Sequence, residues 1–288
     1  MHLIAKYIVP NSIENTRLLD FGIQHIKELT TRNAVKKAIK RNELLLNGKT
    51  TTTGVFLKPN DTIELFEPKI TINKIFELKL DILYEDDYLA VILKPAGVGV
   101  SGNYFKTIQN ALPFNLKPCS QSDKLAIPRP IHRLDRPTSG LLIVAKTHSS
   151  AVKLGKMLEQ KQVEKIYSAI VVGTPKNENN IEFPIDGKIA LSKIKIQKTI
   201  SSVKFSSLSL VKLSPITGRT HQLRIHLDEL GTPILGDKEY GSHTKNLWGK
   251  GLFLCATEIK FSHPVTHQEI SIVIELPNKF NKIIYSKV

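Results

Sequence analysis

The pattern of apolar and polar residues near the N-terminus predicts an amphipathic helix with a cationic side. Within residues 31–41, apolar side chains recur at helical spacing. The basic side chains that repeat every four residues on another face are Arg32, Lys36 and Lys40. Like charges at this spacing repel by roughly 0.2–0.5 kcal/mol per pair, so a bound polyanion would relieve an intrinsic strain. The alternative is a basic face that simply lies in solvent.

A hairpin is predicted directly after this helix. The apolar run 44–46 enters Asn47-Gly48, a dipeptide that tolerates the positive φ of a tight reverse turn. A second turn at 58–61 leads into residues 62–65, where apolar and polar residues alternate as in a half-buried strand. We therefore expect a small domain over residues 1–68, with its core at about 15–68, and a linker over 69–80.

The pattern over residues 81–288 predicts a larger, strand-rich domain. Two strands around an acidic turn are expected within 82–93, and the apolar run 141–145 predicts a buried strand. Thr147 can cap a helix that follows this run. Further strands are expected at 167–172, 205–213, 220–227 and 270–274. Because few helices separate the strands, we expect an α+β fold with a mixed, mostly antiparallel sheet and a few flanking helices, beside a small N-terminal α/β domain.

The charge of the chain adds a candidate partner. Lys and Arg number 41 against 26 Asp and Glu, a net charge of +15, which points to a polyanion and first of all to nucleic acid. A chain that is merely rich in lysine is the alternative. The hydrophobic fraction of 41% and the charged fraction of 23% exclude a disordered or collagen-like chain.

Cysteine content and apolar runs bear on the compartment. Cys119 and Cys255 match no metal-site spacing and are too few for a disulfide scaffold, so we expect free thiols in a reducing compartment and no metal. Residues 1–10 lack the features of a signal peptide, and no run approaches the ~18 apolar residues of a membrane helix. The expected location is the cytoplasm, with no membrane partner.

The segment 132–140 carries the strongest candidate chemistry. Asp135 is flanked by Arg133 and Arg136, whose guanidinium groups would favour its ionised form. This polar loop leads directly into the buried strand 141–145. A surface ion pair that contributes little is the alternative.

The run 132–147, with His-Arg-Leu-Asp followed by Thr-Ser-Gly, resembles the signature of the ribosomal large-subunit type of pseudouridine synthase, the RluA/RluD family. The resemblance covers about residues 81–275. Further blocks in the family's order are 94–97, 164–169, 217–226, 231–237, 240–241 and 261–264. Departures from the family pattern are Pro137, Cys255 and the loop 98–103, which bear on substrate preference more than on chemistry. Residues 15–68 resemble the S-four-type RNA-binding domain, in 17–20, 46–49 and 57–61.

The resemblance implies an RNA pseudouridine synthase that isomerises uridine without a cofactor. It implies that Asp135 is the catalytic carboxylate, acting as nucleophile or base, with Arg224 in an ion pair and Tyr167 against the target uracil. It also implies that Arg133 enters the RNA when the uridine is flipped out. The residues expected to bind RNA are Arg133, His132, Arg136, Arg219, Arg32, Lys36 and Lys40.

The implied partner is structured RNA, with ribosomal RNA favoured and transfer RNA possible, bound by a monomer. A noncatalytic RNA-binding or ribosome-assembly protein is the main alternative, and it should lack the set of Asp135, Tyr167 and Arg224. A metal-dependent RNA hydrolase would need clustered ligands. His221 and His226 lie five residues apart in a predicted strand, hence on opposite faces, so one shared metal ion is not expected. For Arg224 the alternative is a strand arginine that reaches solvent.

Overall fold

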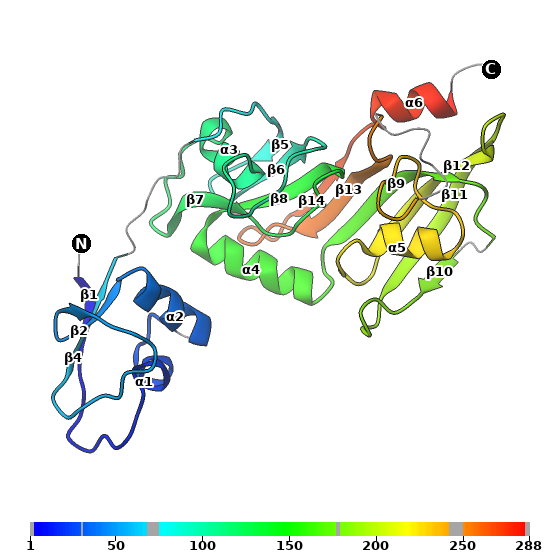
Figure 1. Ribbon diagram of the computed structural model, residues 1–288. Helices are drawn as coiled ribbons and strands as arrows, with labels where there is room; N and C mark the ends of the chain where they lie inside the picture. The colour runs from blue at the N-terminus through cyan, green and yellow to red at the C-terminus, as the bar shows by residue number, and fades with distance from the viewer. Residues whose placement is uncertain (1–2, 30, 68–74, 177–178, 242–249, 286–288) are drawn as a thin grey trace. The chain divides into compact units, whose positions relative to one another are not determined.

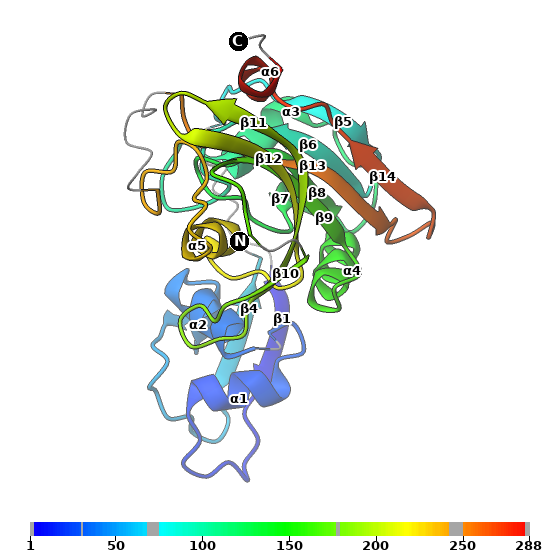
Figure 2. The same cartoon turned by 90° about the vertical axis from the view of Figure 1, so that its right-hand side faces the viewer.

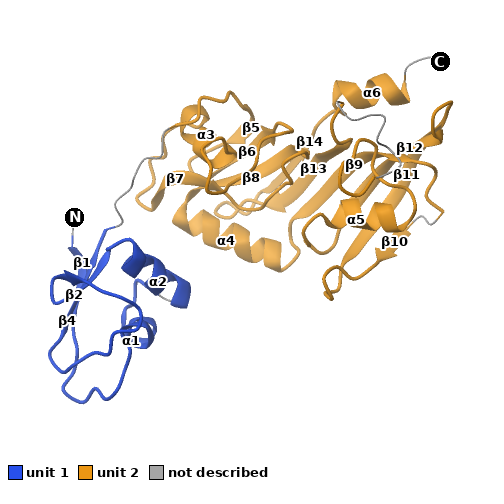
Figure 3. Ribbon diagram, in the orientation of Figure 1, with its two compact units in different colours: residues 1–72 blue, residues 73–288 orange. Residues whose placement is uncertain are grey.

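The computed structural model describes residues 3–29, 31–67, 75–176, 179–241 and 250–285 (Figure 1). The chain divides into two compact units, residues 1–72 and 73–288 (Figure 3). Part of the predicted linker, residues 69–74, lies outside the described residues. The assignment of a separate function to each unit stays a prediction.

Unit 1 is a small four-stranded sheet with two helices. Its elements are β1 (Leu3–Ile8), α1 (Leu18–His25), α2 (Arg32–Lys40), β2 (Leu44–Leu46), β3 (Lys49–Thr50) and β4 (Thr62–Phe66). The strands pair antiparallel in the order β1-β4-β2-β3. The predicted turn is confirmed, because Asn47 and Gly48 have φ of 52° and 73°.

The predicted amphipathic helix of unit 1 is also confirmed, as α2. The side chain of Thr31 accepts a hydrogen bond from the backbone N–H of Ala34 and so caps the helix. Val35, Ala38 and Ile39 are buried in the core of the unit. The opposite face of α2 therefore presents its lysines to solvent.

Unit 2 is built on one large sheet. Its strands are β5 (Asp81–Glu85), β6 (Leu89–Lys94), β7 (Lys124–Pro130), β8 (Ser139–Thr147), β9 (Glu164–Val172), β10 (Asn179–Glu182), β11 (Leu191–Ser202), β12 (Ser206–Pro215), β13 (Leu254–Ser262) and β14 (Glu269–Val273). Its helices are α3 (Ile108–Asn115), α4 (His148–Glu159), α5 (Gln222–Glu229) and α6 (Asn278–Ile284). Helix α4 packs on β8, whereas α5 packs on β12 (Figure 2).

The strand order of the large sheet is β10-β11-β12-β9-β13-β8-β6-β5, and in addition β14 pairs with β13 and β7 with β8. Among the described strands the β8–β13 pair is parallel and the other pairs are antiparallel. The predicted α+β class with a mixed, mostly antiparallel sheet is confirmed.

The apolar run 141–145 becomes the centre of β8 and is buried on both faces. Leu142 and Val144 pack in one core cluster, which also holds the apolar side of α3. Leu141 and Ile143 pack in another, together with the buried face of α4. A strand covered on both sides needs apolar residues at consecutive positions, which explains the unbroken run. Helix α4 begins at the predicted cap Thr147, whose hydroxyl accepts from the Ser150 N–H.

One secondary-structure prediction is wrong. Residues 220–227 were expected to form a strand, but 222–229 form helix α5. Leu223 and Leu227 are buried four residues apart, which is the spacing of one helix face. Arg224 and His226 are polar but also buried, so the apolar and polar residues of 223–227 alternate as they would in a half-buried strand. The helix is followed by Gly231 at φ 69°, a usual helix-ending glycine.

Two other expectations can be compared with the described residues. Cys119 and Cys255 are both free thiols, as expected. Within the described ranges, none of the helices has the length and apolar character needed to cross a membrane.

Gly140 provides a test of how β8 meets β13. Its φ is 121°, and a Cβ at this position would lie 2.7 Å from the Cα of Ala256 and closer still to its backbone N and O. Gly140→Ala should therefore lower the free energy of unfolding by ~2 kcal/mol or more, measured by urea denaturation.

Gly155→Ala is the matched control, because a Cβ there meets nothing within 4 Å in the middle of α4. It should raise the free energy of unfolding by about 0.5–1 kcal/mol. Equal stability of the Gly140 and Gly155 variants would contradict the close approach of β8 and β13.

Candidate active site

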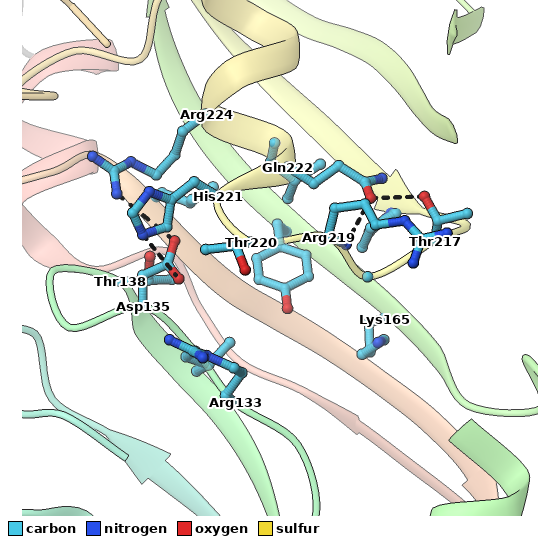
Figure 4. Close-up of a pocket in the computed structure, with 16 residues that line it drawn as sticks. Arg133, Asp135, Thr138, Lys165, Thr217, Arg219, Thr220, His221, Gln222 and Arg224 are labelled. Carbon is cyan, nitrogen blue, oxygen red and sulfur yellow. Dashed lines mark hydrogen bonds and ion pairs between the residues drawn. The ribbon is translucent and has the colours of Figure 1, made fainter. Parts of the chain in front are cut away.

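Asp135 lies in the loop between β7 and β8, at the wall of a cavity of about 130 Å³ (Figure 4). Its side chain is 17% exposed. The loop is tightened by a hydrogen bond from the Thr138 N–H to the Asp135 carbonyl at 3.0 Å. The carboxylate is therefore accessible from the cavity while its backbone is fixed.

A buried lysine fixes this loop through hydrogen bonds to backbone carbonyls. Lys94, at the end of β6, is fully buried, and its ammonium donates to the carbonyls of Thr138 at 2.6 Å, Pro95 at 2.9 Å and Arg136 at 3.3 Å. Burial lowers the pKa of Lys94 to about 8, although the nearby Asp135 carboxylate opposes this shift. The ammonium thus ties the two sides of the Asp135 loop to the end of β6.

Arg224 approaches Asp135 from helix α5. The arginine is 2% exposed, and its Nη1 lies 3.8 Å from Oδ2 of Asp135. Its Nε and Nη2 donate to the two oxygens of Asp237 at 2.6 and 2.7 Å. Burial alone would lower the pKa of Arg224, but the paired carboxylates outweigh it and raise the pKa. The solvent-exposed strand arginine considered as the alternative is excluded.

His221 contacts the second oxygen of Asp135. Its Nε2 lies 3.7 Å from Oδ1 of Asp135, and Figure 4 shows the imidazole between Arg224 and that carboxylate. On its other side, Nδ1 lies 3.2 Å from Oε2 of Glu239 and 3.1 Å from the hydroxyl of Tyr240. Glu239 also pairs with Nη2 of Arg224 at 3.3 Å. The site is thus a network of charges around one carboxylate.

Two buried hydroxyls also line the cavity. Tyr167, on β9, is 8% exposed, and burial raises its pKa, with the Asp135 and Cys255 side chains adding to the shift. The phenol therefore stays protonated at neutral pH. Thr138 is 2% exposed, and its Oγ1 has no hydrogen-bond partner among the described residues.

A second, larger cavity of about 800 Å³ shares part of this wall. The residues common to both are Arg133, Lys165, Pro215, Thr217, Gly218 and Arg219. Lys161 and Lys193 add two more exposed cations to the larger cavity, while its acids are Glu159 and Glu164. We call this larger cavity the basic groove. Its lining carries an excess of positive charge.

The arginines and the histidine of unit 2 that were predicted to bind RNA differ in their exposure and in their hydrogen-bond partners. Arg133 is exposed at both cavities and makes no hydrogen bond or ion pair with its side chain inside the described ranges. Arg136 and Arg219 each donate a side-chain N–H to a backbone carbonyl, that of Gly97 at 2.9 Å and that of Ile189 at 3.1 Å. Both keep an exposed guanidinium.

His132 instead has a partner within the fold. Its Nε2 accepts a hydrogen bond from the Ile143 N–H at 3.1 Å. Burial lowers the pKa of His132 to about 3, and the neighbouring Lys165 contributes to this shift. The ring is therefore neutral and carries no charge toward RNA.

The basic residues predicted in the N-terminal unit lie on the exposed face of α2. Lys36 and Lys40 are exposed, as is Lys37. Arg32 pairs with Asp20 at 2.7 Å, but both side chains remain accessible. Arg32 is thus partly neutralised, whereas the lysines keep their full charge.

The described residues contain no group of three or more His, Cys, Asp or Glu side chains that could hold a metal ion. The prediction that His221 and His226 lie on opposite faces of a strand is wrong. His221 immediately precedes helix α5, and His226 lies inside the helix. His226 is buried, and its Nε2 contacts the Phe183 carbonyl at 3.1 Å.

Several residues of the site were given no role from the sequence. They are Lys94, Thr138, Lys165, His221, Asp237, Glu239 and Tyr240. Most of them lie inside the sequence blocks that resemble the RluA/RluD family. Membership in these blocks was therefore the one sequence signal that could have marked them as site residues. Their roles depend on which side chains meet in space, and the incorrect strand at 220–227 hid the contact of α5 with Asp237.

The Arg224–Asp237 pair predicts a large effect on stability. Asp237→Asn removes the buried, doubly hydrogen-bonded carboxylate of the guanidinium, leaves only the more distant Glu239 and Asp135, and should lower the free energy of unfolding by about 3 kcal/mol at neutral pH. Burial would raise the pKa of Asp237, but hydrogen bonds from Arg224 outweigh it and lower the pKa below the ~3.9 of an unfolded chain.

The difference between wild type and Asp237→Asn should therefore be complete above pH ~4 and shrink as the pH falls through the folded-state pKa. Glu239→Gln is the control, since Glu239 is 56% exposed and its loss should change stability by less than about 1 kcal/mol. A pH-independent difference in urea denaturation would argue against this ion pair as the source.

Comparison with known proteins agrees with the geometry. The sequence profile of the RNA pseudouridylate synthase family matches residues 88–229. Ribosomal large subunit pseudouridine synthase C of Rickettsia bellii is 30% identical over 300 residues, covering 92% of this chain and 96% of that protein. An uncharacterized RNA pseudouridine synthase of Chlorobaculum parvum is 34% identical over 312 residues, with 95% of both chains covered.

Two solved structures share the fold. Human RNA pseudouridylate synthase domain containing 4 is 28% identical with a TM-score of 0.53, covering 69% of this chain and 90% of that one. Human RNA pseudouridylate synthase domain containing 1 is 24% identical with a TM-score of 0.58, covering 76% of this chain and 89% of that one. At this identity the likeness shows the fold alone. Because the Rickettsia bellii and Chlorobaculum parvum proteins are at least 30% identical over more than nine tenths of this chain, the chain belongs to the RluA-type family of RNA pseudouridine synthases.

Proposed function

We propose that Asp135 is the catalytic carboxylate with which this RNA pseudouridine synthase isomerises uridine, and that its natural substrate is ribosomal RNA. The observation that carries the first part is the geometry around Asp135. The carboxylate borders a cavity, its two oxygens face Arg224 and His221, and Tyr167 lines the same cavity. The noncatalytic alternative requires this set to be absent.

Pseudouridine formation breaks the bond between ribose C1′ and uracil N1, turns the base and joins C1′ to C5. The hydrogen on C5 then leaves as a proton, and N1 gains a proton. Neither redox chemistry nor a group carrier is needed, but an oriented carboxylate is, either as a nucleophile at the sugar or as a base. Arg224 would stabilise Asp135 as a carboxylate. The ring of Tyr167 would contact the uracil, with its hydroxyl still protonated and able to donate.

The size of the cavity supports capture of a single base. At about 130 Å³ it is well above the ~10–15 Å³ that a cavity needs to hold one water molecule, yet it is far too small for a duplex. The uridine must therefore leave its stack, which costs a few kcal/mol. Arg133, exposed at the mouth and without a partner in the described chain, is suited to fill the vacated space by stacking on neighbouring bases.

The basic groove supports RNA as the molecule that delivers this base. It shares a wall with the smaller cavity, so a strand that places one nucleotide beside Asp135 can continue along it. Five cations line it, namely Arg133, Lys161, Lys165, Lys193 and Arg219. Cations along a strand neutralise phosphates and release counterions, which is the main source of affinity without sequence preference.

Ribosomal RNA is proposed from the relatives. The Rickettsia bellii protein and several others of about 30% identity are named ribosomal large subunit pseudouridine synthases. The match covers 92% of this chain and 96% of that protein, which is too much of this chain to leave out unit 1 as a whole. Transfer RNA is the competing substrate.

Unit 1 is proposed as an accessory RNA-binding domain of the S-four type. Its helix α2 buries Val35 and Ile39 while Lys36 and Lys40 remain exposed on the other side. No described carboxylate pairs with these two lysines, which leaves both charges available to phosphates.

The catalytic proposal predicts the outcome of a tritium-release assay. Wild-type protein should release label from large-subunit ribosomal RNA carrying tritium at uracil C5, and Asp135→Asn should reduce release at least ~1000-fold because the amide is neither nucleophile nor base. RNA affinity should change little, since Asp135 contributes no attraction to phosphate.

Asp81→Asn, an exposed aspartate at the start of β5, is the control and should keep full activity. Label release by Asp135→Asn at the wild-type rate would overturn the catalytic assignment. Release from transfer RNA but not from ribosomal RNA would overturn the proposed substrate alone.

The accessory domain gives a separate prediction. Lys36→Gln with Lys40→Gln should weaken RNA binding and flatten the plot of log affinity against log salt by about 0.7–0.9 for each phosphate that the protein no longer neutralises. Arg32→Gln should have a smaller effect, because Asp20 already pairs with Arg32. An unchanged salt slope in the double variant would show that α2 does not contact RNA.

A further inference from the structure

The small cavity beside Asp135 and the basic groove meet along a shared wall. We call the residues that line both cavities the shared wall; they are Arg133, Lys165, Pro215, Thr217, Gly218 and Arg219. When the target uridine enters the small cavity and the flanking strand lies in the groove, the RNA chain crosses this wall. A nucleotide is joined to each neighbour through a phosphate. The group of the RNA that lies at the shared wall is therefore a phosphodiester.

The three cations of the shared wall differ in exposure and in partners. Arg133 and Arg219 are exposed, and Nε of Arg219 already donates to the Ile189 carbonyl at 3.1 Å. Lys165 is half-buried, and its ammonium takes part in no hydrogen bond or ion pair within the described ranges. Lys165 is thus the cation of the wall that is partly withdrawn from water and still has its charge available.

The position of Lys165 follows from strand β9. Residues two apart in a strand share a face, so Lys165 and Tyr167 point the same way, and both line the small cavity. Pairing of β9 with β12 and β13 on its two sides fixes the backbone that carries them. Figure 4 shows Lys165 on one side of the cavity and Asp135 on the other. The ammonium is therefore placed to bind a part of the nucleotide remote from Asp135.

The electrostatics of Lys165 favour binding of an anion. Burial lowers the pKa of Lys165, and no carboxylate of the described chain opposes this shift. At Lys94, by contrast, Asp135 opposes the effect of burial. A partly desolvated ammonium without a counter-ion is unfavourable, and its attraction to an anion is weakened less by water than that of an exposed lysine. A phosphate that reaches Lys165 supplies the missing negative charge.

A second part of the shared wall, the turn 217–219, is held rigidly. The Gln222 side chain is 4% exposed, and its Oε1 accepts hydrogen bonds from the Thr217 hydroxyl at 2.7 Å and from the Arg219 N–H at 3.0 Å (Figure 4). Its Nε2 donates to two oxygens at the start of β11. Because this turn is fixed, the flexible stem of Lys165 is the part of the wall that adapts to a phosphate.

We propose that Lys165 binds the phosphate that joins the target uridine to its neighbour, and so fixes how far the nucleotide enters the small cavity. This inference rests on the proposed function, in which Asp135 acts on a uridine held there. The other lysines of the basic groove attract the strand as a whole, whereas Lys165 holds one particular phosphate. A phosphate contact contributes position and no sequence preference.

The test combines Lys165→Gln with removal of one charge from the RNA. The probe is an RNA hairpin with a uridine that the protein modifies, in which a methylphosphonate replaces the phosphate on the 5′ or the 3′ side of that uridine. A 2′-O-methyl group protects the methylphosphonate from cleavage, and the matched hairpin with normal phosphates carries the same group. Dissociation constants are measured with full-length protein carrying Asp135→Asn, so that the uridine is not converted.

The inference predicts that the two changes are not additive. On the hairpin with normal phosphates, Lys165→Gln should raise the dissociation constant about 10–100-fold, because a charged hydrogen bond is lost. The methylphosphonate on one side of the uridine should weaken binding by a similar factor. On that hairpin Lys165→Gln should add less than about 2-fold. Lys165→Arg, which keeps the cation, should bind both hairpins within about 3-fold of the parent protein.

Two controls separate a specific contact from a general one. Lys195 is exposed on β11 and lines neither cavity, so Lys195→Gln should change each dissociation constant by less than about 2-fold. A methylphosphonate placed farther along the strand should leave the effect of Lys165→Gln at full size. A merely structural role of Lys165 would weaken binding of all hairpins by the same factor, and that result would overturn the inference.

Failure of the inference is distinguishable from failure of the proposed function. If Asp135→Asn stops tritium release while Lys165→Gln weakens all hairpins equally, Asp135 is catalytic and Lys165 holds no flanking phosphate. If Asp135→Asn keeps the wild-type rate of release, the proposed function fails, whatever the hairpins show for Lys165.

Discussion

The site depends on a buried guanidinium held by a buried carboxylate. Arg224 and Asp237 are almost completely inaccessible, and either charge alone would be strongly unfavourable in that position. Because Asp237 takes Nε and Nη2, the remaining Nη1 faces Asp135 and has no hydrogen-bond partner in the described chain. The pair therefore fixes a positive group beside Asp135 before any RNA binds, as preorganised electrostatic catalysis requires.

The rest of unit 2 brings the two sides of this interaction together. The Asp135 loop leads into β8, whereas Arg224 lies on α5, which packs on β12 at some distance along the sheet. Strands β13 and β9 connect the two regions, and Gly140 allows β8 to approach β13. Lys94 then holds the loop through its carbonyls. Elements distant in sequence thus meet through the order of strands.

Much of the fold could be predicted from local pattern, and the site less so. The run 141–145, the cap at Thr147 and the turn at Asn47-Gly48 are local signals, and each appears in the structure. Helix α5 was missed because buried polar residues imitate the alternation of a strand. The partnership of Arg224 with Asp237 and Glu239, and the position of His221, could not be derived, since they depend on contacts between elements and on one left-handed residue.

The most direct measurement is a crystal structure of the inactive Asp135→Asn protein bound to a ribosomal RNA fragment that contains its target uridine. We expect a uridine extruded into the small cavity, its base against Tyr167, its C1′ next to residue 135 and the flanking strand in the basic groove. A target uridine that remains stacked in the RNA, or that binds at a site remote from residue 135, would contradict the proposed role of Asp135.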